Sequence, residues 1–292
     1  MTTFTLALAQ IDPVLGDLGR NVQKHAAMAE KALQTGAGLV VFPELSLTGY
    51  SIKDMNWDLA LNPQRDSTQV KELVDLGKSI SIIAGGVEEG GDFGIYNSAF
   101  LFEGGTVKVV HRKTYPPTYG MFEEMRYFSR GMSIRAFDSR LGRLGVLICE
   151  DLWHISAPYV MAMDGASVIM SLTASPTRIA PAAKELQAAS VNTENHRVYG
   201  RLLSTYIAFC NRVGFEDGVG FWGGSQVVGP DGDVVAAGKQ FEEDLVVARI
   251  DENEIRRARR FSRHVLDEDM RIVEQELKRI REEREDARGP GS

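Results

Sequence analysis

The feature that most constrains this chain is an alternation of short apolar runs with segments of helical periodicity. The run 38–42, Gly-Leu-Val-Val-Phe, is apolar throughout, as expected of a strand buried on both faces. The segment before it places Val22, Ala26 and Ala29 on one face of a helix. The pattern predicts strands at 4–10, 38–42, 80–87, 97–102, 106–110, 144–149, 167–172, 206–212, 225–228 and 245–250, and helices at 21–33, 70–76, 158–164 and 182–203.

The connections between these segments predict a mixed α/β sheet structure. Glu103-Gly104-Gly105 joins two strand-like runs and is typical of a hairpin turn, whereas strands separated by helices need crossovers. No linker rich in Pro, Gly or Ser divides the chain, and 292 residues are enough to bury one large core. We therefore predict a single α/β domain over residues 1–250.

The C-terminal part of the chain has a different character. Residues 251–287 are strongly charged and predict one long helix or a pair of helices, with sparse apolar positions such as Ile255 and Leu277. This extension either lies on the surface or packs as an arm on a second subunit, and the pattern leaves both open. Residues 288–292 are predicted to be a disordered tail.

Composition and charge exclude several classes of function. A net charge of -7 argues against general nucleic-acid binding, which needs clustered Lys and Arg, so the Arg-rich stretch 256–260 is expected to be a solvated helix face. No stretch approaches the roughly 20 apolar residues that span a bilayer, and no signal peptide is expected. Two cysteines in a chain of this length are typical of a reduced protein. We predict a cytoplasmic enzyme without a nucleic-acid or membrane partner.

Metal and phosphate sites are not expected either. The five His and two Cys show no closely paired ligand spacing. The pairs Gly85-Gly86 and Gly90-Gly91 lack the Lys-Ser/Thr that follows the glycines of a P-loop. We predict neither a metal ion nor a cofactor.

Three apolar runs end in a residue type that enzymes use in catalysis. They end at Glu44, Lys113 and Cys149. A thiol can act as a nucleophile and a carboxylate as its base, with His154 a further candidate base. However, a charged residue after a strand is often only the strand reaching solvent, and a free Cys is often a small buried hydrophobe, as we expect for Cys210. Spacing alone does not decide between these interpretations.

The sequence around these three residues resembles the signature regions of the nitrilase, or carbon–nitrogen hydrolase, superfamily. The regions occur in the order found in that family, Glu, then Lys, then Cys, and the similarity extends over about residues 4–250. They are Val-Phe-Pro-Glu-Leu-Ser-Leu-Thr-Gly-Tyr at 41–50, His-Arg-Lys-Thr-Tyr-Pro at 111–116 and Gly-Val-Leu-Ile-Cys-Glu-Asp-Leu-Trp at 145–153.

Within the superfamily, the chain resembles the glutaminase domain of glutamine-dependent NAD synthetases. The similar stretches are 117–128, 173–176 and 241–247. The chain ends where a synthetase domain would begin and has no Ser-Gly-Gly-x-Asp-Ser loop, so we do not expect it to make NAD itself. Residues 177–181 depart from the glutaminase pattern, which leaves glutamine open as a substrate.

The resemblance implies a four-layer α-β-β-α sandwich of the nitrilase type that forms a homodimer or larger homo-oligomer through its helical surface. It implies Cys149 as nucleophile, Glu44 as general base and Lys113 as the stabiliser of the oxyanion. Glu124 is implied as a second active-site carboxylate, with Glu123 as the alternative. The implied substrate-contacting residues are Tyr50, Tyr119, Phe122, Glu150, Trp153 and Ser175, of which Tyr50 and Trp153 could equally be core aromatics.

The residues after the nucleophile narrow the expected substrate. Nitrilases place Trp-Glu directly after their Cys, whereas Glu150 and Asp151 follow Cys149 here, which favours amides or carbamoyl compounds over nitriles. We predict a cofactor-free amidase that cleaves a non-peptide C–N bond of a small amide through a thioester, releasing ammonia or an amine and a carboxylic acid. The alternatives are an ammonia-supplying glutaminase subunit acting with a separate synthase, an N-carbamoyl amine hydrolase, and a catalytically silent binding or scaffold protein.

Overall fold

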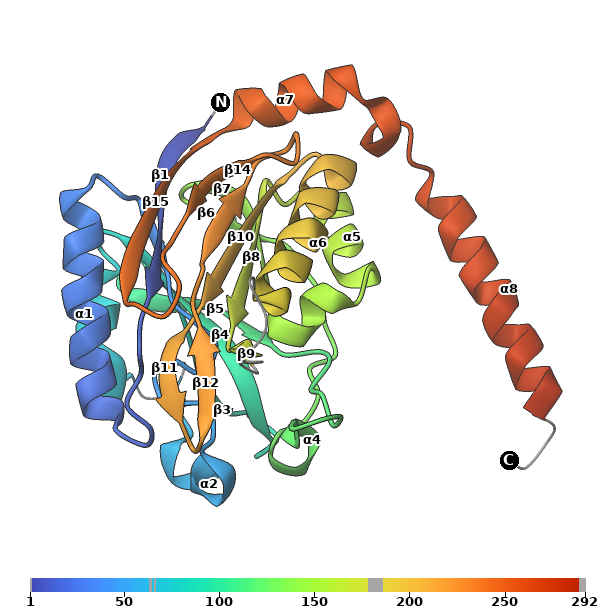
Figure 1. The fold of residues 1–292 in the computed structure, drawn as a ribbon. Coiled ribbons are helices and arrows are strands. Elements are labelled where there is room, and N and C mark those ends of the chain that lie inside the picture. Colours follow the sequence, from blue (N-terminus) through green and yellow to red (C-terminus); the bar gives the residue numbers. More distant parts are fainter. Residues whose placement is uncertain (1, 63–64, 66, 178–185, 289–292) are drawn as a thin grey trace.

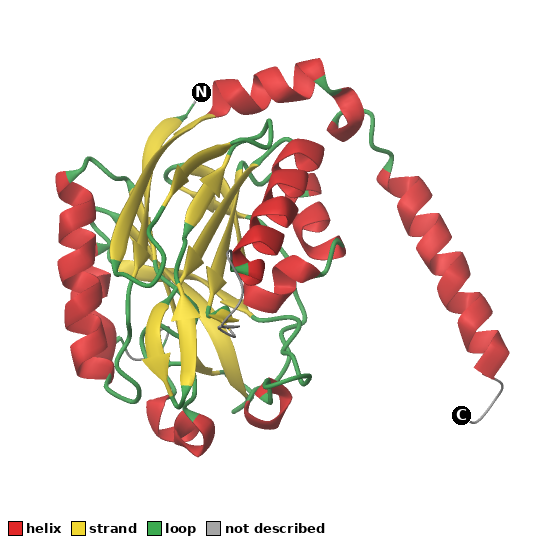
Figure 2. Ribbon diagram, viewed as in Figure 1, coloured by secondary structure: helices red, strands yellow, loops and turns green. Residues whose placement is uncertain are grey.

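Two six-stranded sheets lie face to face, and helices cover the outer face of each (Figure 1). This computed structural model describes residues 2–62, 65, 67–177 and 186–288. The four layers are easily followed when helices and strands are coloured separately (Figure 2). The predicted α-β-β-α sandwich is confirmed.

The first sheet joins the two ends of the sandwich domain. Its central strand β1 pairs in parallel with β2 and antiparallel with β15, so residues about 240 positions apart lie side by side. In spatial order the strands are β15 (Asp244–Asp251), β1 (Thr3–Gln10), β2 (Leu39–Val41), β3 (Ser81–Glu89), β4 (Ile95–Glu103) and β5 (Thr106–Arg112). The predicted hairpin at Glu103-Gly104-Gly105 connects the last two.

The second sheet contains three parallel strands at its centre, which the sequence predicted, and two edge strands that it did not. In spatial order they are β14 (Val234–Ala237), β13 (Gln226–Val228), β10 (Tyr206–Asn211), β8 (Val168–Thr173), β7 (Gly142–Ile148) and β6 (Phe137–Ser139). The missed strands β6 and β14 have only 3 and 4 residues and are largely exposed, so neither is long enough to show a period. A third, small sheet was also missed and consists of β11 (Val213–Glu216), β12 (Val219–Trp222) and β9 (Pro176–Thr177).

Helices α1 (Leu18–Gln34) and α3 (Lys71–Leu76) pack on the first sheet, and α5 (Ser156–Met163) and α6 (Gln187–Leu203) on the second. Within the described residues α6 begins at Gln187, and 182–185 of the predicted helix lie outside them. The short helices α2 (Asn56–Leu59) and α4 (Glu124–Tyr127) lie beyond one end of the sheets.

Successive side chains of a strand point to opposite faces of the sheet, and this explains how the layers are held together. In β1, Leu6 and Leu8 point into the space between the sheets, whereas Ala7 and Ala9 face α1. Large side chains therefore fill the sheet–sheet core, and alanines let the helix approach closely. Burial of a Leu side chain of this kind contributes about 1.5–3 kcal/mol.

The C-terminal extension forms a pair of helices, α7 (Glu252–Phe261) and α8 (Met270–Arg288). Ile255 of α7 packs into the core between the sheets, whereas α8 projects away from the sandwich (Figure 1). Arg288 belongs to α8 and not to a tail, and the rest of the predicted tail lies outside the described residues. The division of the chain near residue 250 stays a prediction. In the part of the chain that the structure describes, no helix combines the length and apolar character needed to cross a bilayer.

Candidate active site

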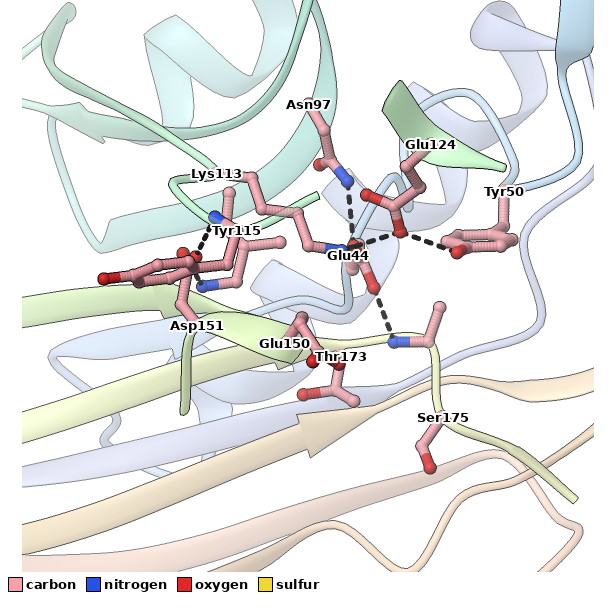
Figure 3. Close-up of polar contacts among 12 residues, drawn as sticks. Glu44, Tyr50, Asn97, Lys113, Tyr115, Glu124, Glu150, Asp151, Thr173 and Ser175 are labelled. Atoms are coloured by element: carbon pink, nitrogen blue, oxygen red, sulfur yellow. Dashed lines mark hydrogen bonds and ion pairs between the residues drawn. The ribbon is translucent and has the colours of Figure 1, made fainter. Parts of the chain in front are cut away.

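Glu44, Lys113 and Cys149 all follow strand ends, as the sequence indicated. Lys113 comes directly after β5 of the first sheet and Cys149 directly after β7 of the second, while Glu44 lies three residues beyond β2. Stacking of the two sheets therefore brings together residues that are far apart in sequence. The loops after β2 and β5 carry Glu44 and Lys113 into one buried cluster (Figure 3), and the charges of both act on the thiol of Cys149.

Lys113 lies between two carboxylates. Its Nζ is 2.7 Å from Glu44 Oε1 and 2.7 Å from Glu124 Oε1, and the Lys113 side chain is 1% exposed. Burial alone would lower the pKa of Lys113, but the charges of Glu124 and then Glu44 raise it well above its usual value. The ammonium group is therefore kept charged although its side chain is buried.

Glu124 is the second carboxylate of the cluster, and its neighbour Glu123 is exposed. The Tyr50 hydroxyl donates a hydrogen bond of 2.7 Å to Glu124 Oε1, the oxygen that also contacts Lys113. Burial raises the pKa of Glu124 to about 7, with Lys113 lowering it and Glu44 raising it. This carboxyl group can consequently hold a proton close to neutral pH.

Glu44 is oriented by two further donors that the sequence did not reveal. Asn97 Nδ2 donates to Glu44 Oε1 over 2.8 Å, and the backbone N–H of Ala174 donates to Oε2 over 3.0 Å. Asn97 lies on β4, where an amide side chain in a largely apolar strand was the available signal. Each carboxylate oxygen thus has a fixed partner, which limits rotation of the group.

Cys149 occupies a sharp turn between β7 and the short 3₁₀ helix Cys149–Trp153. Its φ of 46° lies in the left-handed region, which is uncommon for a residue other than glycine. Although Cys149 is partly exposed to the pocket, enclosure of its thiol raises its pKa well above the usual value, with Glu44 adding to the effect and Lys113 opposing it. The resting residue is therefore a thiol that needs a base to become a nucleophile.

Asp151 ties the turn after Cys149 to the loop after Lys113. Its side chain is completely buried and accepts from the backbone N–H groups of Ile148 (3.0 Å), Thr114 (3.0 Å) and Tyr115 (2.8 Å). The sequence identified Asp151 only as a nearby charge. Its bonds instead give it a structural role, holding two active-site loops together.

A pocket of about 550 Å³ opens onto Cys149. Five predicted substrate-contacting residues line it, whereas Tyr50 lies outside the lining and contacts Glu124 instead. The Tyr119 hydroxyl donates to Glu150 Oε2 over 2.9 Å, so this carboxylate is held at the wall of the pocket. The predicted residues found in the lining are Tyr119, Phe122, Glu150, Trp153 and Ser175.

The second sheet and α6 contribute pocket residues that the sequence analysis missed. They include Ser171, Thr173, Asn192, Asn195, His196 and Phe209. Polar residues near the end of the apolar strand β8 were the available signal for the first two. His154, the other candidate base, stacks on Tyr115 with ring centroids 3.6 Å apart and is not among the described residues of the lining.

Two further predictions concern residues outside the pocket. Cys210 is buried between the sheets, with its Sγ 3.2 Å from the carbonyl oxygen of Val41, as expected of a small core residue. Among the described residues, no group of three or more His, Cys, Asp or Glu side chains is arranged to hold a metal ion.

Comparison with known proteins places this geometry in a family. The family model "Carbon-nitrogen hydrolase" matches residues 5–260. Glutamine-dependent NAD(+) synthetase from Acinetobacter baylyi is 31% identical over 253 residues, which cover 86% of this chain and 45% of that protein. Nitrilase from Pyrococcus abyssi is 29% identical over 250 residues, covering 84% of this chain and 89% of that protein.

The chain thus spans about half the length of the curated synthetases that it matches. The crystal structure of a carbon-nitrogen hydrolase from Helicobacter pylori G27 shares the fold, with a TM-score of 0.83 and 24% identity over 95% of this chain and 99% of that one. Because the family model accounts for most of its residues, the chain belongs to the carbon-nitrogen hydrolase family.

Proposed function

We propose that this carbon-nitrogen hydrolase is an amidase that cleaves a small amide through a thioester on Cys149. The observation that carries the proposal is the buried contact of Lys113 with Glu44 and Glu124, next to a thiol that lines an open pocket. The base and the cation lie buried beside the nucleophile, and the nucleophile itself lines the pocket that a small molecule can enter. The proposed catalytic residues are Glu44, Lys113 and Cys149, and Glu124 is the second carboxylate of the site, in contact with Lys113.

The first half of the reaction forms the thioester. Glu44 takes the proton of Cys149 as the thiolate adds to the amide carbon. The resulting oxyanion accepts hydrogen bonds from Lys113 Nζ and from the backbone N–H that follows Cys149, and one such donor is typically worth about 3 kcal/mol. Glu44 then gives its proton to the nitrogen, the C–N bond breaks, and ammonia or an amine leaves.

The second half releases the acid. Glu44 deprotonates a water molecule, whose oxygen adds to the thioester carbon, and the same donors stabilise the second oxyanion. The C–S bond then breaks, the proton on Glu44 returns to the sulfur, and the carboxylic acid departs. The sum of the steps is amide plus water giving acid plus amine. Glu124 acts as a positioning residue because it holds Lys113 through the same bond length as Glu44 does.

Glu150 suggests a preference within this substrate class. Its carboxylate lies in the pocket wall and accepts from Tyr119, so a substrate with an amino or other donor group would find an acceptor there. Glu150→Gln should therefore raise KM for amine-bearing amides more than for simple amides. An unchanged KM for every amine-bearing amide would remove this preference from the proposal.

An ammonia-supplying glutaminase subunit is the second candidate. The similarity to glutamine-dependent NAD synthetases over less than half of their length favours it. Glutamine hydrolysis that rises when a separate synthase is added would support this function, whereas full activity of the isolated chain on simple amides would favour the amidase. Both candidates use the same thioester chemistry.

Replacement of the nucleophile tests the common mechanism. Cys149→Ala should abolish ammonia release from a panel of amides, carbamoyl amines, glutamine and nitriles while the protein stays folded. Cys210→Ala is the matched control, because it removes a thiol buried between the sheets and should retain turnover. Mass spectrometry should detect an acyl adduct on Cys149 in the wild type, and turnover by the Cys149→Ala variant would refute the mechanism.

A further inference from the structure

The pocket wall beneath α6 contains polar groups that the mechanism does not use. In the second sheet, Phe209 of β10 lies in register with Ser171 of β8 on one side and with Gln226 of β13 on the other. His196 of α6 packs over this row, with its ring centroid 4.7 Å from that of Phe209. Polar residues on both sides of Phe209 are unusual for a sheet face covered by a helix, since such faces are normally apolar.

The contacts of Gln226 determine which nitrogen of His196 carries hydrogen. The amide nitrogen of Gln226 faces His196 Nδ1, and its Oε1 faces the Thr193 hydroxyl at 3.3 Å. Nε2 of Gln226 then donates to His196 Nδ1 over 2.7 Å. Burial lowers the pKa of His196 to about 3, so the ring is neutral. A neutral imidazole whose Nδ1 accepts must carry its hydrogen on Nε2.

This leaves His196 with a donor at the edge of its ring opposite Gln226. The ring lines the same 550 Å³ pocket as Cys149, and the described residues supply no hydrogen-bond acceptor for its Nε2. The side chains of Phe122, Leu152 and Val191 provide an apolar lining in the same pocket. The pocket therefore combines a nucleophile, an apolar wall and a fixed neutral donor.

We propose that His196 Nε2–H binds an oxygen acceptor at the end of the substrate remote from the scissile amide. The substrate class is then a primary amide whose acyl chain has an apolar spacer followed by a carbonyl or carboxylate oxygen. This inference rests on the proposed amidase function and adds what binds the end of the substrate that does not react. A buried donor discriminates because a substrate without the oxygen leaves the donor unpaired.

Matched substrates test the subsite. Primary amides that end in a methyl ketone are compared, over a series of spacer lengths, with analogues in which the ketone oxygen is replaced by =CH2, and with amides that end in a carboxylate. The wild type should show at least about tenfold higher kcat/KM for an oxygen-bearing amide than for its methylene analogue at the best length. The preferred oxygen group identifies whether a carbonyl or a carboxylate is bound, and no preference at any length overturns the proposal.

Variants of the donor test its identity. His196→Phe keeps a ring against Phe209 but removes Nε2–H, so the preference should fall to within about twofold while acetamide hydrolysis persists. Gln226→Met leaves His196 in place but removes the donor to its Nδ1, so the ring hydrogen is no longer held on Nε2. This variant should also weaken the preference, and it serves as the test if His196→Phe fails to fold. His264→Phe is the matched control, since this ring is exposed, contacts Ser262 and Arg201, and is not among the described residues of the pocket lining, so its loss should leave the preference intact. Full preference in both His196→Phe and Gln226→Met would overturn the assignment.

A binding measurement separates this inference from the proposed function. Cys149→Ala protein is titrated calorimetrically with the ketone amide and its methylene analogue. If the wild type hydrolyses no amide, the proposed function fails, and equal affinities in this titration overturn the subsite as well. If hydrolysis proceeds without regard to the remote oxygen, only the subsite fails.

Discussion

At the scale of single residues, the chemistry depends on how burial and neighbouring charge act on a few groups. Cys149 is held as a thiol because its enclosure, and then Glu44, raise its pKa, while Lys113 remains an ammonium group between two carboxylates. A reactive residue at a strand end was predictable from the sequence. The protonation state of Cys149 was not predictable, because it depends on the charges of Glu44 and Lys113, which loops of the first sheet contribute.

Glu124 gives a pH-dependent prediction. Its pKa is about 7 in the folded protein against an ordinary value of 4.5, so the folded state binds more protons than the unfolded state between these values. The free energy of unfolding contributed by this group therefore falls as pH rises from about 4.5 to about 7. Glu124→Gln has no titrating proton and should show a flatter pH dependence in that window, measured by urea unfolding at a series of pH values.

The neighbouring residue provides the control for this experiment. Glu123 is exposed, so Glu123→Gln should keep the pH dependence of the wild type. Equal slopes in the wild type and in Glu124→Gln would contradict the assigned protonation of Glu124.

At the scale of elements, the unpredicted hairpin β11–β12 supports the active-site loop that carries Tyr50. Glu216 Oε1 accepts from the backbone N–H groups of Tyr50 (2.8 Å) and Ser51 (2.5 Å), and its Oε2 accepts from Arg212 Nη1 (2.6 Å). Arg212 is 1% exposed, so this ion pair is buried. Gly49 has a φ of 83°, and a Cβ there would clash with Leu15 and lie only 3.0 Å from Glu216 Oε2. The hairpin thereby positions Tyr50 against Glu124.

Glu216→Gln should disturb this arrangement. Loss of the carboxylate removes the buried charge partner of Arg212 and leaves it with the half-exposed Asp12 at 3.2 Å, which should lower the free energy of unfolding by about 2–4 kcal/mol. Because Tyr50 donates to Glu124, the variant should also shift the pH profile of kcat, which a purely structural effect would leave in place.

A neighbouring ion pair offers a comparison for that variant. Asp217 of the same hairpin pairs with Lys53 on the exposed surface, so Asp217→Asn should leave both stability and the pH profile nearly unchanged. If Glu216→Gln behaves like Asp217→Asn in denaturant unfolding and in pH–rate measurements, the proposed support of the loop is wrong.

At the scale of the whole molecule, apolar side chains are exposed on one helical surface, formed by α5, α6 and α8. A groove of about 1310 Å³ lies between α8 and the outer faces of α5 and α6. Exposed apolar side chains line it, among them Val198 (49% exposed), Leu202 (54%) and Leu277 (62%). Apolar exposure of this extent is typical of a surface that associates with another protein. Homo-oligomerisation through this helical surface stays a prediction.

Leu202→Glu tests the predicted association. A carboxylate placed in an apolar interface loses solvation without gaining a partner, so the variant should shift the protein toward the monomer in light-scattering measurements. Val234→Glu, at an exposed position of edge strand β14, should leave the mass unchanged. A wild type that is monomeric at all concentrations would contradict the prediction.

The sequence by itself determined the local features of this protein. Apolar runs and helical spacing predicted most strands and helices. When one face of a strand or helix is buried, apolar residues recur along the sequence with the period of that element. The motifs around Glu44, Lys113 and Cys149 indicated the family, which the comparisons confirmed. Strands of 3 and 4 residues such as β6 and β14 are too short to show a period and were missed.

Only the tertiary structure decided which side chains meet. Asn97 contacts Glu44 across 53 positions, and Gln226 contacts His196 across 30, because stacked sheets and a covering helix bring them together. Asp151 and Glu216 bond to backbone groups of loops distant in sequence, and no local pattern encodes such partners. The periodicity of apolar residues along the sequence indicates which positions are buried. The chemical role of a residue depends instead on the neighbours that the packed layers place around it.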